Sequence, residues 1–197
     1  MIGIMNRSGL VSLAALLLVA CASSPPSKFY TLTSVPPNGS APAASAADTV
    51  PVRVAAVHVP AMLDRQEIAR PSAGNQLEIN GQERWDAPLD EMIQRVLTLD
   101  LITRLPSGSV ILPAAPAPAD VDSIAVNILQ FQSDVTGSVV FEGSWSLVPP
   151  HASSPALIRT FRYTAAASSQ STGDEVTTMS TLLGQLADDL ARGLPAR

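Results

Sequence analysis

The sequence predicts an α+β fold, a single domain in which two helices pack on a largely antiparallel sheet. Residues 138–147 alternate between apolar and polar side chains, with Val140 as the exception, which is typical of a strand with one face in the core and one in water. Residues 89–99 and 176–190 instead repeat their apolar side chains with helical spacing. Residues 50–197, which contain these patterns, are long enough for one domain with its own core.

Four short strands are predicted before the first helix. Residues 50–60 alternate in apolar character and slip by one residue at Ala55-Ala56, which predicts a buried strand with a bulge. Turn-forming residues 71–75 separate two β-prone segments, which predicts a hairpin. Residues 28–33, nearer the N-terminus, are rich in aromatic and β-branched side chains, which predicts a further strand. The predicted strands are residues 28–33, 50–60, 64–70 and 76–80.

The two predicted helices have recognisable starts. Asp86 is placed to cap the first helix, and Pro88 suits its first turn. Thr172 and Glu175 stand at the spacing of a capping box at the start of the second helix. The residues that end the first helix are Arg104, Pro106 and Gly108. The predicted apolar faces comprise Leu89, Met92, Ile93, Val96, Leu97 and Leu99 in the first helix, and Val176, Met179, Leu182, Leu183, Leu186 and Leu190 in the second.

Between the helices the chain predicts a meander of three strands. A short strand at residues 110–112 comes first, followed by a Pro-rich surface loop at residues 113–118 that cannot be helical. A turn at residues 134–137 and a loop at residues 149–155 then separate neighbouring antiparallel strands. The three strands of the meander are residues 124–131, 138–147 and 157–165.

The N-terminal residues are typical of a secretory signal. Arg7 is the single charge before an apolar run at residues 10–20, and this run is too short for a transmembrane helix, which needs about 20 residues. The run ends in Leu18-Val19-Ala20-Cys21, which resembles the bacterial lipobox. In that family of signals the Cys thiol takes a diacylglycerol and a peptidase cuts before it. A stray Cys in a secreted protein is the alternative, although Cys21 is the only cysteine of the chain.

These signals divide the chain into three parts. Residues 1–20 are a lipoprotein signal peptide, residues 21–49 a lipidated tether rich in Pro, Ala and Ser, and residues 50–197 the α+β domain. If the strand at residues 28–33 docks on the domain, the free tether has about seven residues and spans at most roughly 25 Å, whereas an undocked strand leaves about 30 residues. The lipobox is followed by Ala22-Ser23 without an Asp, which favours sorting to the outer membrane.

The composition excludes several classes of function. The chain carries 12 basic and 17 acidic residues, so nucleic acid is not an expected partner. His58 and His151 are isolated, so no zinc site is expected, and neither a Gly-rich phosphate loop nor a Gly-x-Ser-x-Gly motif occurs. The pairs Asp90-Glu91 and Asp188-Asp189 are predicted to lie on exposed helix faces. We therefore expect no catalytic residues, no metal and no cofactor.

Several short motifs follow one another along the chain, with the residues Cys21, Tyr30, Leu32, Asp64, Arg65, Trp85, Leu89, Phe131 and Trp145. The order of these motif residues is similar to that of a known family, the ABC-type transport auxiliary lipoproteins, also described as the PqiC-like group. The similarity covers most of the chain that follows the signal. Aromatic residues at the ends of strands and helices are also common in protein cores, so both a core role and a family-specific role stay open for them. The Asp64-Arg65 dipeptide is either a surface salt bridge or a functional contact.

The resemblance implies a lipoprotein that is anchored in the outer membrane and faces the periplasm. It also implies partners, namely an MCE-domain protein and components of an ABC transporter that moves lipids between the two membranes. On this interpretation Cys21 holds the protein in the membrane, and the folded body docks a partner without catalysing a reaction. A structural envelope lipoprotein without a role in transport is the alternative, and a homo-oligomer is left open.

Overall fold

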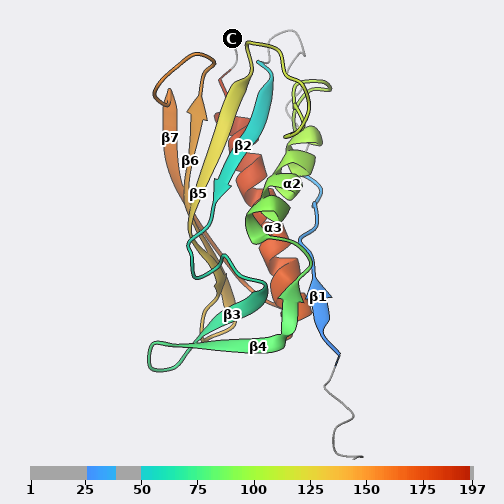
Figure 1. The fold of residues 1–197 in the computed structure, drawn as a ribbon, viewed down its shortest axis with the longest axis vertical. Coiled ribbons are helices and arrows are strands. Elements are labelled where there is room, and N and C mark those ends of the chain that lie inside the picture. Colours follow the sequence, from blue (N-terminus) through green and yellow to red (C-terminus); the bar gives the residue numbers. More distant parts are fainter. Residues whose placement is uncertain (1–25, 39–49, 196–197) are drawn as a thin grey trace, which may run out of the picture.

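The computed structural model describes residues 26–38 and 50–195. The predicted signal peptide and the lipobox residues Leu18, Val19, Ala20 and Cys21 lie outside the described residues. Two helices and two sheets form the described part of the chain, which confirms the predicted α+β class (Figure 1). The helices are α2 (Leu89–Ile102) and α3 (Thr172–Gly193), and the strands are β1 (Lys28–Tyr30), β2 (Val52–His58), β3 (Glu67–Ser72), β4 (Gln76–Trp85), β5 (Asp122–Ser133), β6 (Ser138–Val148) and β7 (Leu157–Ala166).

Both sheets are mixed rather than purely antiparallel. The larger sheet has the order β2-β5-β6-β7, in which β5, β6 and β7 form the predicted antiparallel meander and β2 lies parallel to β5. The smaller sheet has the order β1-β4-β3, with β1 parallel to β4 and a β3–β4 hairpin. A parallel pair needs a long crossover connection, and the hairpin together with α2 supplies one between β2 and β5.

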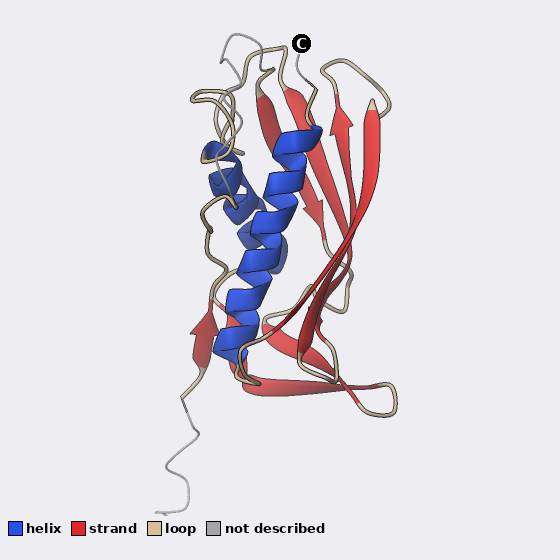
Figure 2. Cartoon of the chain, turned by 180° about the vertical axis from the view of Figure 1, so that it is seen from behind, coloured by secondary structure: helices blue, strands red, loops and turns tan. Residues whose placement is uncertain are grey.

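Both helices cover one face of the larger sheet (Figure 2). The inward-facing side chains of β5 and β6, such as Val126 and Phe141, meet the apolar stripes of the helices, and all but one of the predicted stripe residues are buried. The exception is Leu99, which is 40% exposed. At about 100° per residue, Leu99 lies on the far side of the helix from Leu97, at the edge of the buried stripe beyond Met92.

Several boundaries differ from the predicted ones because backbone partners decide them. The predicted bulge in β2 is confirmed between Val54 and Ala56. The strand predicted at residues 64–70 begins only at Glu67, because the preceding residues form a turn in which the Asp64 N–H donates to the carbonyl of Pro60 (3.1 Å). The strand predicted at residues 110–112 is reduced to a single bridge between Val110 and Val52.

The caps of both helices also differ from the predicted ones. Pro88, rather than Asp86, is the N-cap of α2, and it makes no side-chain capping bond. At α3 the capping residue is Ser171, whose hydroxyl accepts from the Asp174 N–H (3.2 Å), so the predicted capping box of Thr172 and Glu175 is wrong by one position.

Candidate functional site

The chain after β1 crosses both helices, and we call residues 31–36 the strap. Leu32 is 1% exposed and belongs to the core. The carbonyl of Leu32 accepts from Arg95 of α2 (3.3 Å), and the Thr33 N–H donates to Ser180 Oγ of α3 (3.1 Å). Together with the pairing of β1 and β4, these contacts show that the N-terminal strand docks on the body, which is the first of the two alternatives for the tether.

Asp100 of α2 binds the middle of the strap. Its Oδ1 accepts from the Ser34 hydroxyl (2.5 Å) and from the Val35 N–H (2.9 Å), and the side chain is fully buried. Burial raises the pKa of Asp100 above its ordinary value, although the hydrogen bonds from Ser34 and Val35 oppose this rise. The carboxylate therefore holds the strap in place at a cost in desolvation.

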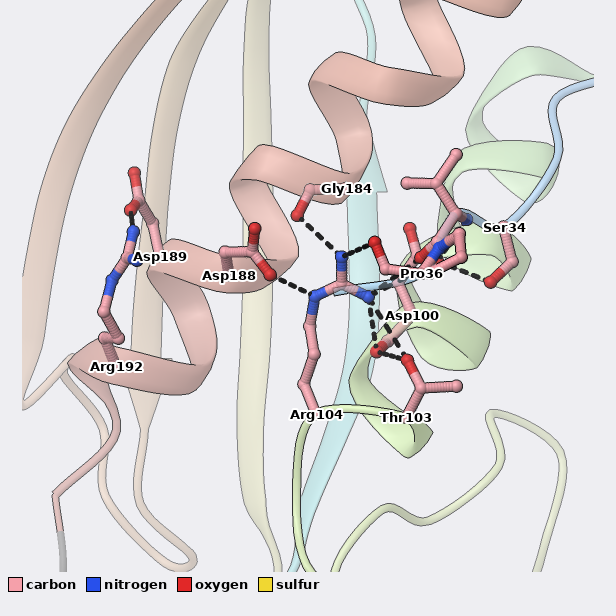
Figure 3. Close-up of polar contacts among 10 residues, drawn as sticks. Ser34, Pro36, Asp100, Thr103, Arg104, Gly184, Asp188, Asp189 and Arg192 are labelled. Carbon is pink, nitrogen blue, oxygen red and sulfur yellow. Dashed lines mark hydrogen bonds and ion pairs between the residues drawn. The ribbon is translucent and has the colours of Figure 1, made fainter. Parts of the chain in front are cut away.

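Arg104 joins the strap, α2 and α3 through one buried guanidinium (Figure 3). Its Nε donates to Asp188 Oδ1 (2.6 Å), and its Nη2 donates to the carbonyl of Gly184 (3.2 Å). On the strap it donates to the carbonyls of Val35 (3.2 Å) and Pro36 (3.3 Å). A planar group with five donors suits such a junction, because it can serve several acceptors at fixed angles.

This junction overturns part of the sequence interpretation. The sequence predicts Asp188 on an exposed helix face, but its side chain is only 12% exposed because it faces Arg104. For Arg104 itself, the sequence predicts only a role at the end of the first helix. The spacing of Asp100 and Arg104 by four residues is the one sequence signal that could have indicated the pair, which is 3.7 Å apart.

Gly184 lets the strap approach α3 closely, and this contact yields a prediction. A Cβ at Gly184 would lie 2.1 Å from Val35 Cγ2, so Gly184→Ala should lower the free energy of unfolding by about 1–3 kcal/mol, measured by urea denaturation. If the strap did not contact Gly184, the same change should stabilise the helix by about 1 kcal/mol. A loss of stability would therefore indicate the contact with the strap, and a gain would indicate its absence. Adding Val35→Ala should restore most of the loss, and a failure to do so would show that the strap is not its cause.

A groove of about 600 Å³ lies where β1, the β3–β4 hairpin, the β5–β6 turn and the start of α3 meet. Arg70 on its floor donates to Glu175 Oε2 (2.6 Å), Glu83 Oε2 (3.1 Å) and Thr172 Oγ1 (2.7 Å). Burial alone would lower the pKa of Arg70, but the carboxylates of Glu175 and Glu83 more than offset it, so the pKa lies above its ordinary value. This network ties the smaller sheet to α3, and Glu175 serves it rather than the expected capping box.

The motif residues separate into a buried and an exposed group. Trp85, Leu89, Phe131 and Trp145 are all at most 6% exposed and lie in one continuous core with Leu32, against which Tyr30 packs. Asp64 and Arg65 are exposed and precede β3. Arg65 pairs with Glu67 (3.4 Å) rather than with Asp64, which contradicts a salt bridge within the dipeptide. The structure therefore does not bring the motif residues together into one polar site.

The described residues contain neither a candidate metal site nor a candidate membrane-spanning helix. Within residues 26–38 and 50–195, no group of three or more His, Cys, Asp or Glu side chains is placed to hold a metal ion. In the same part of the chain, neither helix is both long and apolar enough to cross a bilayer.

Two curated relatives share the sequence pattern. The chain is 27% identical over 141 residues to the intermembrane transport lipoprotein PqiC of Escherichia coli, an alignment that covers 72% of this chain and 74% of the relative. PqiC of Shigella flexneri matches with the same identity and coverage.

Solved structures share the fold. The crystal structure of an uncharacterized protein superposes with a TM-score of 0.70 at 21% identity, covering 86% of this chain and 99% of the other. Protein XCC0632 of Xanthomonas campestris gives a TM-score of 0.64 at 22% identity, covering 83% and 92%. The family model for the ABC-type transport auxiliary lipoprotein component matches residues 30–191, which run from the last residue of β1 through the strap and α2 into the last turn of α3. The chain therefore belongs to the family of ABC-type transport auxiliary lipoprotein components, as its motif order indicated.

Proposed function

We propose that this protein is a membrane-anchored auxiliary lipoprotein of an ABC/MCE-type system that transports lipids between two membranes. In this role Cys21 carries the lipid, the outer membrane holds the lipid, and the folded body faces the periplasm. The body acts as a docking component and performs no catalysis. The membership in the family supports this proposal, as does the similarity to relatives named intermembrane transport lipoproteins.

The observation that carries the proposal is the way in which the strap joins the N-terminal strand to the body. The chain from Cys21 to β1 spans at most roughly 25 Å, and residues 31–36 are bonded to both helices. A lipid on Cys21 would therefore hold the whole body near the membrane surface rather than on a long free tether. Such confinement raises the effective concentration of a partner in the same envelope, so a weak docking contact would suffice.

The test of the docking role is crosslinking in cells from exposed positions. Gln94 and Asp188 would be poor positions, because Gln94 donates to the carbonyl of Val54 and Asp188 faces Arg104. Leu112 and Ile158 are 52% and 63% exposed, and both lie near strand starts at the end of the molecule away from β1 (Figure 1). A crosslinker at these positions should capture an MCE-domain protein.

Other outcomes separate the alternatives. Repeated absence of an MCE-domain protein, with unchanged lipid asymmetry and detergent resistance in a deletion strain, would favour a structural envelope lipoprotein. Crosslinks between two copies of the chain would establish a homo-oligomer.

Lipidation gives a separate prediction. Cys21→Ser removes the thiol that accepts the lipid, so the precursor should keep residues 1–20 and the acylated N-terminal residue should disappear. Mass spectrometry of membrane-extracted protein measures both. A natural protein that retains residues 1–20, or that carries no acyl group on Cys21, would contradict the anchor.

A further inference from the structure

Exposed apolar side chains gather at the end of the molecule where β1 begins. Phe29 is 64% exposed on β1, and Val135 is 68% exposed in the β5–β6 turn. Leu77 and Ile79 are 44% and 40% exposed on β4. Scattered apolar side chains are normal on protein surfaces, but several at one end of a molecule indicate a contact surface. We call these four residues the apolar rim.

The members of the apolar rim belong to the strands and the turn that border the groove, but only Val135 lines the groove itself. The groove is lined by Lys28, which precedes Phe29, by Glu78 between Leu77 and Ile79, and by Val135 itself. Side chains alternate along a strand, so Leu77 and Ile79 lie on the face of β4 opposite to Glu78 and the groove. Figures 1 and 2 both show the β3–β4 hairpin crosswise to the long axis of the molecule, at the end where β1 begins. The hairpin thus extends this end sideways.

The position of the lipobox cysteine indicates that the apolar rim faces the membrane. Only about seven residues separate Cys21 from β1, so a lipid on Cys21 holds this end within roughly 25 Å of the bilayer. The opposite end, which holds the last turn of α3 and the β6–β7 loop, lies away from β1 (Figure 1). An exposed apolar surface on the anchored side therefore meets lipid before it meets another protein.

We propose that the apolar rim contacts the membrane surface and orients the body on it, so that the long axis of the molecule points away from the plane of the bilayer. This proposal rests on the lipid anchor of the proposed function. Apolar side chains and one end of a hairpin can enter the boundary between head groups and acyl chains, as surface-bound amphipathic segments do. The lipid on Cys21 supplies the affinity, and the apolar rim supplies the orientation.

The charges at this end decide which force dominates the contact. Lys28 and Arg70 lie beside Glu78, Glu83 and Asp134 around the groove, and Arg70 is already paired with Glu83. This end therefore carries no excess of positive charge that would attract anionic lipids. The contact should depend on apolar burial and should persist at high salt.

The test uses the lipidated full-length protein in vesicles of phosphatidylethanolamine and phosphatidylglycerol. Cys21 is the only cysteine and its thiol is occupied by the lipid, so each introduced cysteine is the single labelling site. Leu77→Cys and Val135→Cys place a fluorescent label on the apolar rim. Leu112→Cys and Ile158→Cys are matched controls, because these residues are similarly exposed at the opposite end. A nitroxide attached to lipid acyl chains quenches labels that enter the membrane, and iodide quenches labels in water.

We expect the nitroxide to quench the labels at residues 77 and 135 several-fold more than those at residues 112 and 158, with the reverse order for iodide. The difference should persist at about 1 M salt, where the Debye length is about 3 Å. If the protein floats with the vesicles but all four labels are quenched alike, or if the difference in quenching disappears at high salt, the apolar contact is overturned while the lipid anchor stands. Protein that fails to float with the vesicles would overturn the lipid anchor of the proposed function and this contact with it.

Discussion

Replacing Arg104 with methionine is expected to lower the free energy of unfolding by about 3–5 kcal/mol, because removing one partner of a buried ion pair leaves the other charge uncompensated. Arg104 is 3% exposed, and Asp100 beside it is fully buried. The change would also leave the carbonyls of Val35 and Gly184 without the donor that they share. Urea denaturation followed by tryptophan fluorescence measures the loss, which is a large fraction of the stability of a typical domain.

Two control variants isolate the effect of the junction. Arg192→Met removes an ion pair with Asp189 whose arginine side chain is 64% exposed, and it should change stability by no more than about 0.5 kcal/mol. Asp100→Asn keeps the acceptor for Ser34 and Val35 and removes a charge that burial disfavours, so it should cost less than Arg104→Met. If Arg104→Met were as mild as Arg192→Met, the strap would not depend on the guanidinium.

The local pattern of the sequence was sufficient to predict most of the helices and strands. Alternation in β6 and helical spacing in α2 and α3 are properties of short windows, and the core that they form follows from their apolar faces. The predicted bulge in β2 and the β3–β4 hairpin were also local, since a slip in alternation and a run of turn residues mark them. Gly74 and Asn75 adopt the positive φ angles of 73° and 60° that this turn requires.

The polar junctions could not be predicted in the same way because their partners are far apart in the sequence. Arg70 meets Glu175, and Arg104 meets Asp188, only after the sheets and helices have packed together. The parallel pairing of β1 with β4 has the same origin, because it joins segments that no short window contains. For the same reason, a cap chosen from spacing alone gave Thr172 and Glu175, whereas both side chains bind Arg70.

Replacing Trp145 with alanine is the second change with a large expected effect. Trp145 is 2% exposed on the inward face of β6, between its paired neighbours Val126 and Arg159. Its ring also fills the space beside Gly193, where an added Cβ would lie 3.0 Å from the ring. Truncation of a buried tryptophan typically costs about 3–5 kcal/mol, which corresponds to a fall in Tm of about 6–20 °C for a domain of this size.

Thermal unfolding of Trp145→Ala beside Leu129→Ala separates a core role from an interface role. Leu129 is 68% exposed on the neighbouring strand, so its truncation should leave the Tm nearly unchanged. Trp145→Phe should lose less than Trp145→Ala, because it keeps an aromatic ring in contact with the core. If Trp145→Ala kept its Tm but lost crosslinking to a partner in cells, Trp145 would belong to a docking surface. Its burial against α3 and β7 makes a fall in Tm the expected result, because the cavity would lie inside the core on which both helices pack.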